Sequence, residues 1–151
     1  MTLDRLPRRP TKVQFTTLLT VTTLAVYATI AFGAAVASSS AGACSQWPLC
    51  YPSADAVVSV GFALAVAHRA LTAVAGLLLV LALFWARSVD LDPRARYALL
   101  AAAVAFAGQV GIGAAVALGD IAYVTEIHLA VAAAVFLAML TALGWALEDG
   151  E

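Results

Sequence analysis

The chain has 151 residues, of which 64% are hydrophobic and 11% are charged, and its mean hydropathy is +0.97. This composition excludes an ordinary water-soluble domain, and a formal net charge of −1 does not suggest electrostatic steering of nucleic acid. We therefore expect the lipid bilayer as the solvent and no nucleic-acid partner.

Four apolar segments cover most of the chain, at residues 15–37, 57–86, 97–118 and 121–147. Each exceeds the ~20 residues that a helix needs to cross about 30 Å of hydrocarbon. A spanning backbone must satisfy its own hydrogen bonds, and the two-residue alternation of a membrane barrel is absent. The sequence predicts an all-α protein, with residues 1–151 forming one bundle of four transmembrane helices.

The basic residues predict how the bundle is oriented. Four of them precede the first span and three lie between the second and third spans, whereas the other two connections have none: Arg5, Arg8, Arg9 and Lys12, then Arg87, Arg94 and Arg96. Because Lys and Arg are retained on the cytoplasmic side, both termini and the 87–96 connection are predicted to be cytoplasmic.

The connection after the first span carries the only two cysteines, in the stretch ACSQWPLCYP at 43–52. Cys44 and Cys50 are predicted to face outward, into a compartment that permits disulfides. A structural disulfide would close a loop of about seven residues, worth roughly 2–2.5 kcal/mol by chain entropy. The alternative is a redox-active pair that exchanges with a thioredoxin-like partner. A zinc site lacks a nearby histidine, and covalent haem attachment needs C-x-x-C-H spacing.

Few ionisable side chains lie within the spans, where an arginine costs about 2.5–3.5 kcal/mol at mid-helix. They are His68 and Arg69 in the second span and Glu126 and His128 in the fourth. These two spans run in the same direction, and each histidine lies in the outer half of its span. Two imidazoles at similar depth can meet in the interior of a four-helix bundle.

Two interpretations of the histidines stay open at this point. Two neutral imidazoles without a thiolate or carboxylate cluster suit the axial positions of a haem iron, and Arg69 would then be available to a propionate. Small residues near both histidines would leave room for the macrocycle: Ala63, Ala65, Ala67, Ala70, Ala73 and Gly76, then Ala130, Ala132, Ala133 and Ala134. Alternatively, each histidine forms a hydrogen bond between helices and the alanines allow close packing.

The third span carries Gln109 together with Gly111 and Gly113. Glycines at this spacing allow close approach of a neighbouring helix. Gln109 is either an interhelical hydrogen-bond donor or a residue of a pocket.

Several of these stretches together resemble the haem A synthase family. SSSAGACSQWPLCYP (38–52) followed by AHRALTAVAG (67–76) is similar to the family's first outer loop and second helix. QVGIGAAV (109–116) resembles a segment of its third helix, and IHLAVA (127–132) resembles the fourth-helix histidine region. The resemblance covers most of the chain, and the W-P-L-C and H-R elements are its specific part.

The resemblance implies a ligand set and a size. Most family members have eight helices in two halves, and this chain resembles the half that bears the cysteines. By resemblance, His68 and His128 are the axial iron ligands, Arg69 and Gln109 contribute to cofactor binding, and Cys44 and Cys50 form a disulfide. Haem b, haem O or both are the implied haems. A half-size chain is expected to form a homodimer or higher homo-oligomer.

The implied activity is oxidation of the C8 methyl group of haem O to the formyl group of haem A, for terminal oxidase assembly. The implied location is a prokaryotic, archaeal-type cell membrane, and the candidate partners are a haem O synthase, a thiol-redox protein and an electron donor. The family's glutamate three residues before the helix-two histidine is Ala65 here, and the cysteine spacing is one residue shorter. Glu126 is the candidate catalytic carboxylate, although it is not at the matching position.

The missing glutamate supports an alternative function. The chain would then be a non-catalytic b-type haem protein that transfers electrons or handles haem during oxidase assembly. A third interpretation is a structural membrane subunit with a loop disulfide.

Overall fold

The computed structural model describes residues 9–39, 44, 46–51, 59–119 and 122–148. These residues form four helices and no strand: α1 (Lys12–Ser38), α2 (Val60–Trp85), α3 (Pro93–Leu118) and α4 (Val124–Glu148). All four are long and apolar enough to cross a membrane. The predicted all-α bundle of four membrane helices is confirmed, and the cytoplasmic placement of the termini stays a prediction.

The helices begin at capping residues that hydropathy does not reveal. α1 starts at Lys12 rather than 15, because Thr11 and Gln14 form a reciprocal capping box with bonds of 3.0 and 3.2 Å. α2 starts at Val60 because the Ser59 hydroxyl accepts the backbone N–H of Phe62. The earlier start predicted for α2, at 57, lies outside the described residues, as does the start predicted for α4 at 121.

α3 has a charged cap and also starts earlier than predicted, at Pro93 rather than 97. The Asp92 carboxylate accepts the backbone N–H of Arg94 and pairs with its guanidinium at 2.8 Å. This bond from the Arg94 side chain lowers the pKa of Asp92 below its ordinary value. Pro93 suits the first helical position, where no intrahelical N–H is needed.

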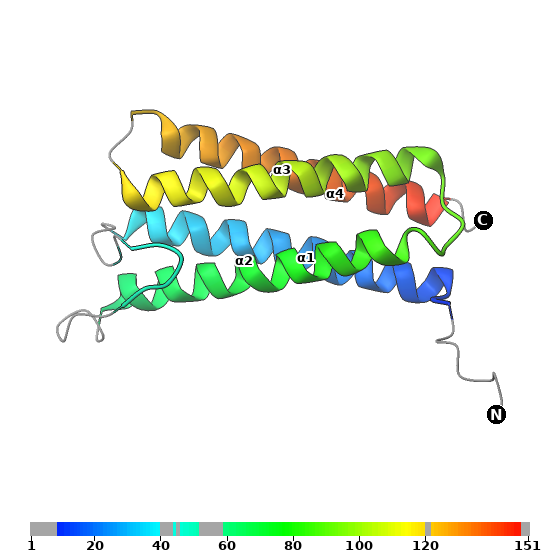
Figure 1. Cartoon of the computed structure of the whole chain (residues 1–151), viewed down its shortest axis with the longest axis horizontal. Coiled ribbons are helices and arrows are strands. Elements are labelled where there is room, and N and C mark those ends of the chain that lie inside the picture. The colour runs from blue at the N-terminus through cyan, green and yellow to red at the C-terminus, as the bar shows by residue number, and fades with distance from the viewer. Residues whose placement is uncertain (1–8, 40–43, 45, 52–58, 120–121, 149–151) are drawn as a thin grey trace, which may run out of the picture.

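The chain runs up and down through the bundle as two helical hairpins, as Figure 1 shows. α1 packs along α2 and α3 packs along α4, while α1 and α4 join the two hairpins; α2 and α3 contact each other least. One end, called here the loop end, holds the connections from α1 to α2 and from α3 to α4. The other, called the terminal end, holds the start of α1, the end of α4 and the α2–α3 connection.

Tight packing is concentrated in the half of the bundle toward the terminal end. The buried apolar cluster takes the first half of α1 and α3 and the second half of α2 and α4, plus the connection between α2 and α3. Its members are Phe15, Leu19, Val26, Ala75, Leu79, Ala82, Ala86, Val89, Leu91, Ala95, Leu99, Ala102, Val135, Met139, Ala142 and Ala146. Alanines on α2, α3 and α4 let the backbones approach, and Phe15, Leu99 and Met139 fill the space between them.

Buried threonines in α1 do not disturb this packing, because their hydroxyls stay within the helix. Thr22, Thr23 and Thr29 each donate to the carbonyl four residues earlier, over 2.7–2.8 Å. Each side chain therefore presents its methyl group to the neighbouring helices while its polar atom is satisfied.

The packed half is expected to tolerate no added volume. Ala142 is fully buried in the cluster, whereas Ala101 is exposed on α3. Ala142→Leu should reduce the free energy of unfolding by about 1–3 kcal/mol through overpacking, and Ala101→Leu should leave it nearly unchanged. Denaturation of the purified proteins in detergent measures both. Equal stability of the two variants would contradict a packed core in this half.

Candidate functional site

The loop-end half of the bundle holds a large cavity between the two hairpins. Its volume is about 1060 Å³, just above the range of small-molecule sites, which is roughly 300–1,000 Å³. Val26, Gly76, Phe106 and Val135 line it where it meets the packed half, and the ring of Phe106 lies against Gly76. His68, Arg69, Gln109 and His128 all line the same cavity, so both hairpins contribute polar groups.

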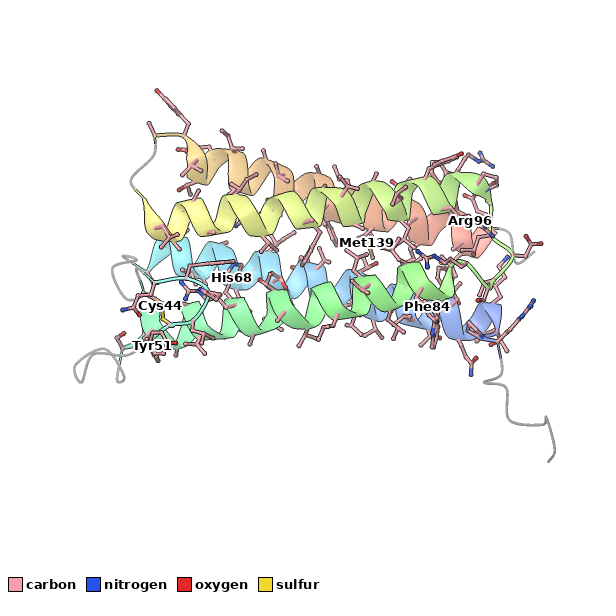
Figure 2. All side chains as sticks on the ribbon, viewed as in Figure 1. Cys44, Tyr51, His68, Phe84, Arg96 and Met139 are labelled. Atoms are coloured by element: carbon pink, nitrogen blue, oxygen red, sulfur yellow. A yellow bond between two sulfur atoms is a disulfide. The ribbon has the colours of Figure 1, made fainter. Side chains whose placement is uncertain are left out.

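His68 is held by a hydrogen bond across the first hairpin. Its Nδ1 lies 3.0 Å from the backbone carbonyl oxygen of Thr29 on α1. A carbonyl oxygen only accepts, so Nδ1 carries the proton and donates it. In a neutral imidazole the lone pair is then on Nε2, which makes Nε2 the atom available to a metal. Figure 2 shows His68 at the loop end, close to the segment with Cys44 and Tyr51.

His128 is held differently, through its backbone. The Gln109 amide Nε2 donates to the carbonyl oxygen of His128 over 2.7 Å, which joins α3 to α4. Among the described residues, the buried side-chain nitrogen and oxygen atoms without a hydrogen bond are Gln109 Oε1 and His128 Nδ1. The Nε2 atoms of His68 and His128 are not among these buried atoms, and both rings line the cavity, so Nε2 of each ring is accessible from it.

A glycine faces each histidine ring from the preceding helix. A Cβ atom at Gly33 would lie 2.9 Å from Cε1 of His68, and one at Gly113 would lie 3.0 Å from Cε1 of His128. Contacts under about 3.0 Å are not tolerated by a real Cβ, so any larger residue at Gly33 would push the ring away. Gly33 follows Thr29 by one helical turn, and Gly113 follows Gln109 by one turn. Each hairpin therefore supports its histidine with a polar group and a glycine four residues later.

The two histidines of the cavity suit a metal whose other ligands belong to a bound cofactor. No group of three or more His, Cys, Asp or Glu gathers among the residues that the structure describes, so a metal held by the protein alone is not indicated there. Two imidazoles with accessible Nε2 atoms, in a mostly apolar cavity, match a metal whose remaining ligands come from a macrocycle. Haem therefore fits the residues present.

The cysteine loop covers part of the cavity and is attached to α2. Cys44 and Cys50 form a disulfide, and both line the cavity together with Trp47, Pro48 and Leu49. The Arg69 guanidinium donates to the carbonyl oxygens of Pro48 and Cys44, each over 3.4 Å. Arg69 is thus placed where it can hold the loop and also reach an anionic group in the cavity.

Two other predicted positions lie apart from this polar set. Glu126 is exposed in the first turn of α4 and is not among the residues that line the cavity. Its catalytic role stays a prediction. Ala65 is 8% exposed and lines the cavity one turn before His68. The described residues place no carboxylate on the cavity surface.

Sequence reasoning missed Thr29 and Gly33 entirely. Thr29 acts through its backbone carbonyl, which leaves no mark in the sequence. Gly33 did leave a signal: it is a glycine inside an apolar span, and such residues often mark a close approach. Gly113 was noted for helix packing, and the structure shows that a histidine ring is what approaches it.

Comparisons with known proteins show one family and two curated relatives. The family model described as cytochrome oxidase assembly protein, COX15-CtaA, matches residues 2–140. The chain is 35% identical over 107 residues to a protoheme IX farnesyltransferase of Haloarcula marismortui, covering 70% of this chain and 23% of that protein. It is 36% identical over 107 residues to protoheme IX farnesyltransferase 1 of Natronomonas pharaonis, covering 70% and 22%. The chain spans less than a quarter of either relative's length, and no solved structure matches.

One labelling experiment tests the disulfide and the predicted orientation. Intact cells are treated with a membrane-impermeant maleimide, with and without a membrane-impermeant reductant. We expect no labelling of Cys44 or Cys50 before reduction and labelling of both afterwards, because the two cysteines are bonded and are predicted to face outward. Labelling without reductant would contradict the bond, and labelling only after permeabilisation would contradict the orientation.

Proposed function

Because the chain belongs to the COX15-CtaA family of cytochrome oxidase assembly proteins, we propose that it binds haem and oxidises the C8 methyl group of haem O to the formyl group of haem A. The observation that carries this proposal is the pair of histidines, one from each hairpin, on a single large cavity. The relatives add support, because their name states that they attach a farnesyl group to protoheme IX.

His68 and His128 would hold the iron through Nε2, and Arg69 would pair with a propionate. Converting a methyl to a formyl group removes four electrons and adds one oxygen atom, so an external oxidant and oxygen source such as dioxygen would be consumed. Bound haem would supply the redox chemistry of this oxidation. The protein's part is to fix His68 through Thr29, to join α3 to α4 through Gln109, and to keep water out with an apolar lining. Gly33 and Gly113 keep the two rings from being displaced by a side chain of the preceding helix.

A second function is favoured by one specific observation. The position where the resemblance expects a glutamate is the buried methyl group of Ala65, and the described residues put no other carboxylate on the cavity surface. The described residues would therefore offer a haem held there no carboxylate side chain for proton transfer. The alternative is therefore a non-catalytic b-type haem protein that transfers electrons or handles haem during oxidase assembly.

We also propose a cell-membrane location and partners of matching chemistry. A haem O synthase would supply the substrate, and an electron donor or thiol-redox protein would act from outside the membrane. A homodimer would restore the eight helices of full-length family members. We also propose a prokaryotic host; the matching relatives come from Haloarcula marismortui and Natronomonas pharaonis.

Haem binding is tested by absorption spectroscopy of the purified protein. The wild type should show a Soret band with the features of a low-spin iron bound by two histidines, and His68→Ala or His128→Ala should lose those features. Thr141→Ala is the matched control, because this exposed α4 threonine bonds only within its helix, to Leu137. A wild type purified without pigment, from cells that make haem, would contradict the proposal.

The reaction is tested separately by pigment extraction. Co-expression with a source of haem O should yield haem A in the extract of wild-type cells, identified by mass. If folded, haem-loaded protein yields only haem O and haem B, the non-catalytic alternative is correct. In that case Ala65→Glu, which places a carboxylate one turn before His68, is expected to gain haem A formation.

A further inference from the structure

Gln109 Oε1 and His128 Nδ1, the buried side-chain atoms without a partner in the part of the chain that the structure describes, lie on the same helix pair and have complementary chemistry. The Gln109 amide is oriented by its bond to the His128 carbonyl, because only its nitrogen can donate to that oxygen. Oε1 is therefore an acceptor that lacks a donor. His128 Nδ1 becomes a donor when it carries the ring proton. Leaving both unpaired costs about 1–3 kcal/mol for each group.

The first hairpin shows how such a pair is completed. His68 Nδ1 donates to an oxygen of the preceding helix, at Thr29, and a glycine one turn later faces the ring. In the second hairpin the preceding helix offers Gln109 and, one turn later, Gly113 against the His128 ring. The second hairpin lacks one feature of the first, a hydrogen bond to Nδ1 of its histidine.

We propose that Gln109 is the positioning residue of His128: its Oε1 accepts the proton of Nδ1, so that Nε2 of His128 is the atom presented to the cavity. The amide oxygen and nitrogen share one carbon, and the nitrogen already lies against the backbone of His128. The proposal requires the amide and the ring to rotate so that the two unpaired atoms meet. Gln109 then serves His128 as the Thr29 carbonyl serves His68.

This role rests on the proposed function only for its purpose, since the proposed hydrogen bond joins two groups of the protein and needs no haem to form. It can therefore be tested there. The chain has two histidines in total, so ring ¹⁵N labelling gives two sets of signals, and His68→Gln assigns them. The spectra are taken at a pH where both rings are neutral. Each set reports which ring nitrogen carries the proton.

Two substitutions distinguish a role of Gln109 in orienting the His128 ring from a role in joining α3 to α4 alone. Gln109→Glu keeps an acceptor but loses the donor to the His128 carbonyl, whereas Gln109→Met keeps the length and loses both. We expect His128 to carry its proton on Nδ1 in the wild type and in Gln109→Glu. In Gln109→Met the proton should move to Nε2 or exchange between the nitrogens. His68 should keep its Nδ1 proton throughout, which also shows that each variant is folded.

A wild-type His128 protonated on Nε2 would overturn the proposal. So would equal effects of Gln109→Glu and Gln109→Met, because that result would mean that only the bond between α3 and α4 matters. In haem-loaded protein, Gln109→Met should raise the reduction potential relative to the wild type and Gln109→Glu should lower it, since an acceptor on Nδ1 makes the ligand more basic. Failure to bind haem would refute the proposed function and leave the tautomer result standing.

Discussion

The structure depends on an unequal distribution of packing along the bundle. In the half near the terminal end, alanines bring the helix backbones close, and Phe15, Leu99 and Met139 fill the space between them. Helices in a membrane gain little from hydrophobic burial, so this contact must supply most of the cohesion. Because one half supplies it, the other half can hold the helices around a cavity of about 1060 Å³ without losing the fold.

In the half of the bundle that holds the cavity, the polar side chains bond mainly to backbone carbonyl oxygens. The Thr29 carbonyl orients His68, the His128 carbonyl accepts Gln109, and the carbonyls of Cys44 and Pro48 accept Arg69. A carbonyl oxygen has two lone pairs, so one already bonded within a helix can accept a second donor. The apolar composition of the spans is therefore compatible with several directed interactions.

Part of this could be predicted from the sequence. Four long apolar segments were enough for the number and type of helices, because the bilayer fixes both length and composition. The helix starts were placed less well, since Thr11, Ser59 and Asp92 act through capping geometry rather than hydropathy. His68 and His128 stood out as ionisable residues in apolar surroundings, and the structure places both on one cavity. The role of Thr29 could not be predicted, because every residue type has the same carbonyl.

Orientation of His68 by a backbone carbonyl limits how this side of the cavity can vary among species. The oxygen that orients His68 belongs to the main chain, so no change of side chain at position 29 can delete it. The position of the His68 ring is instead sensitive to substitution of Gly33, where a single added carbon atom would reach the ring. On the opposite side, Gly113 likewise faces the His128 ring, but the polar group beside His128 is the side-chain amide of Gln109, which natural substitution can remove or replace. Natural variation that changes how a histidine is held is therefore expected at Gln109 on α3 rather than at position 29 on α1.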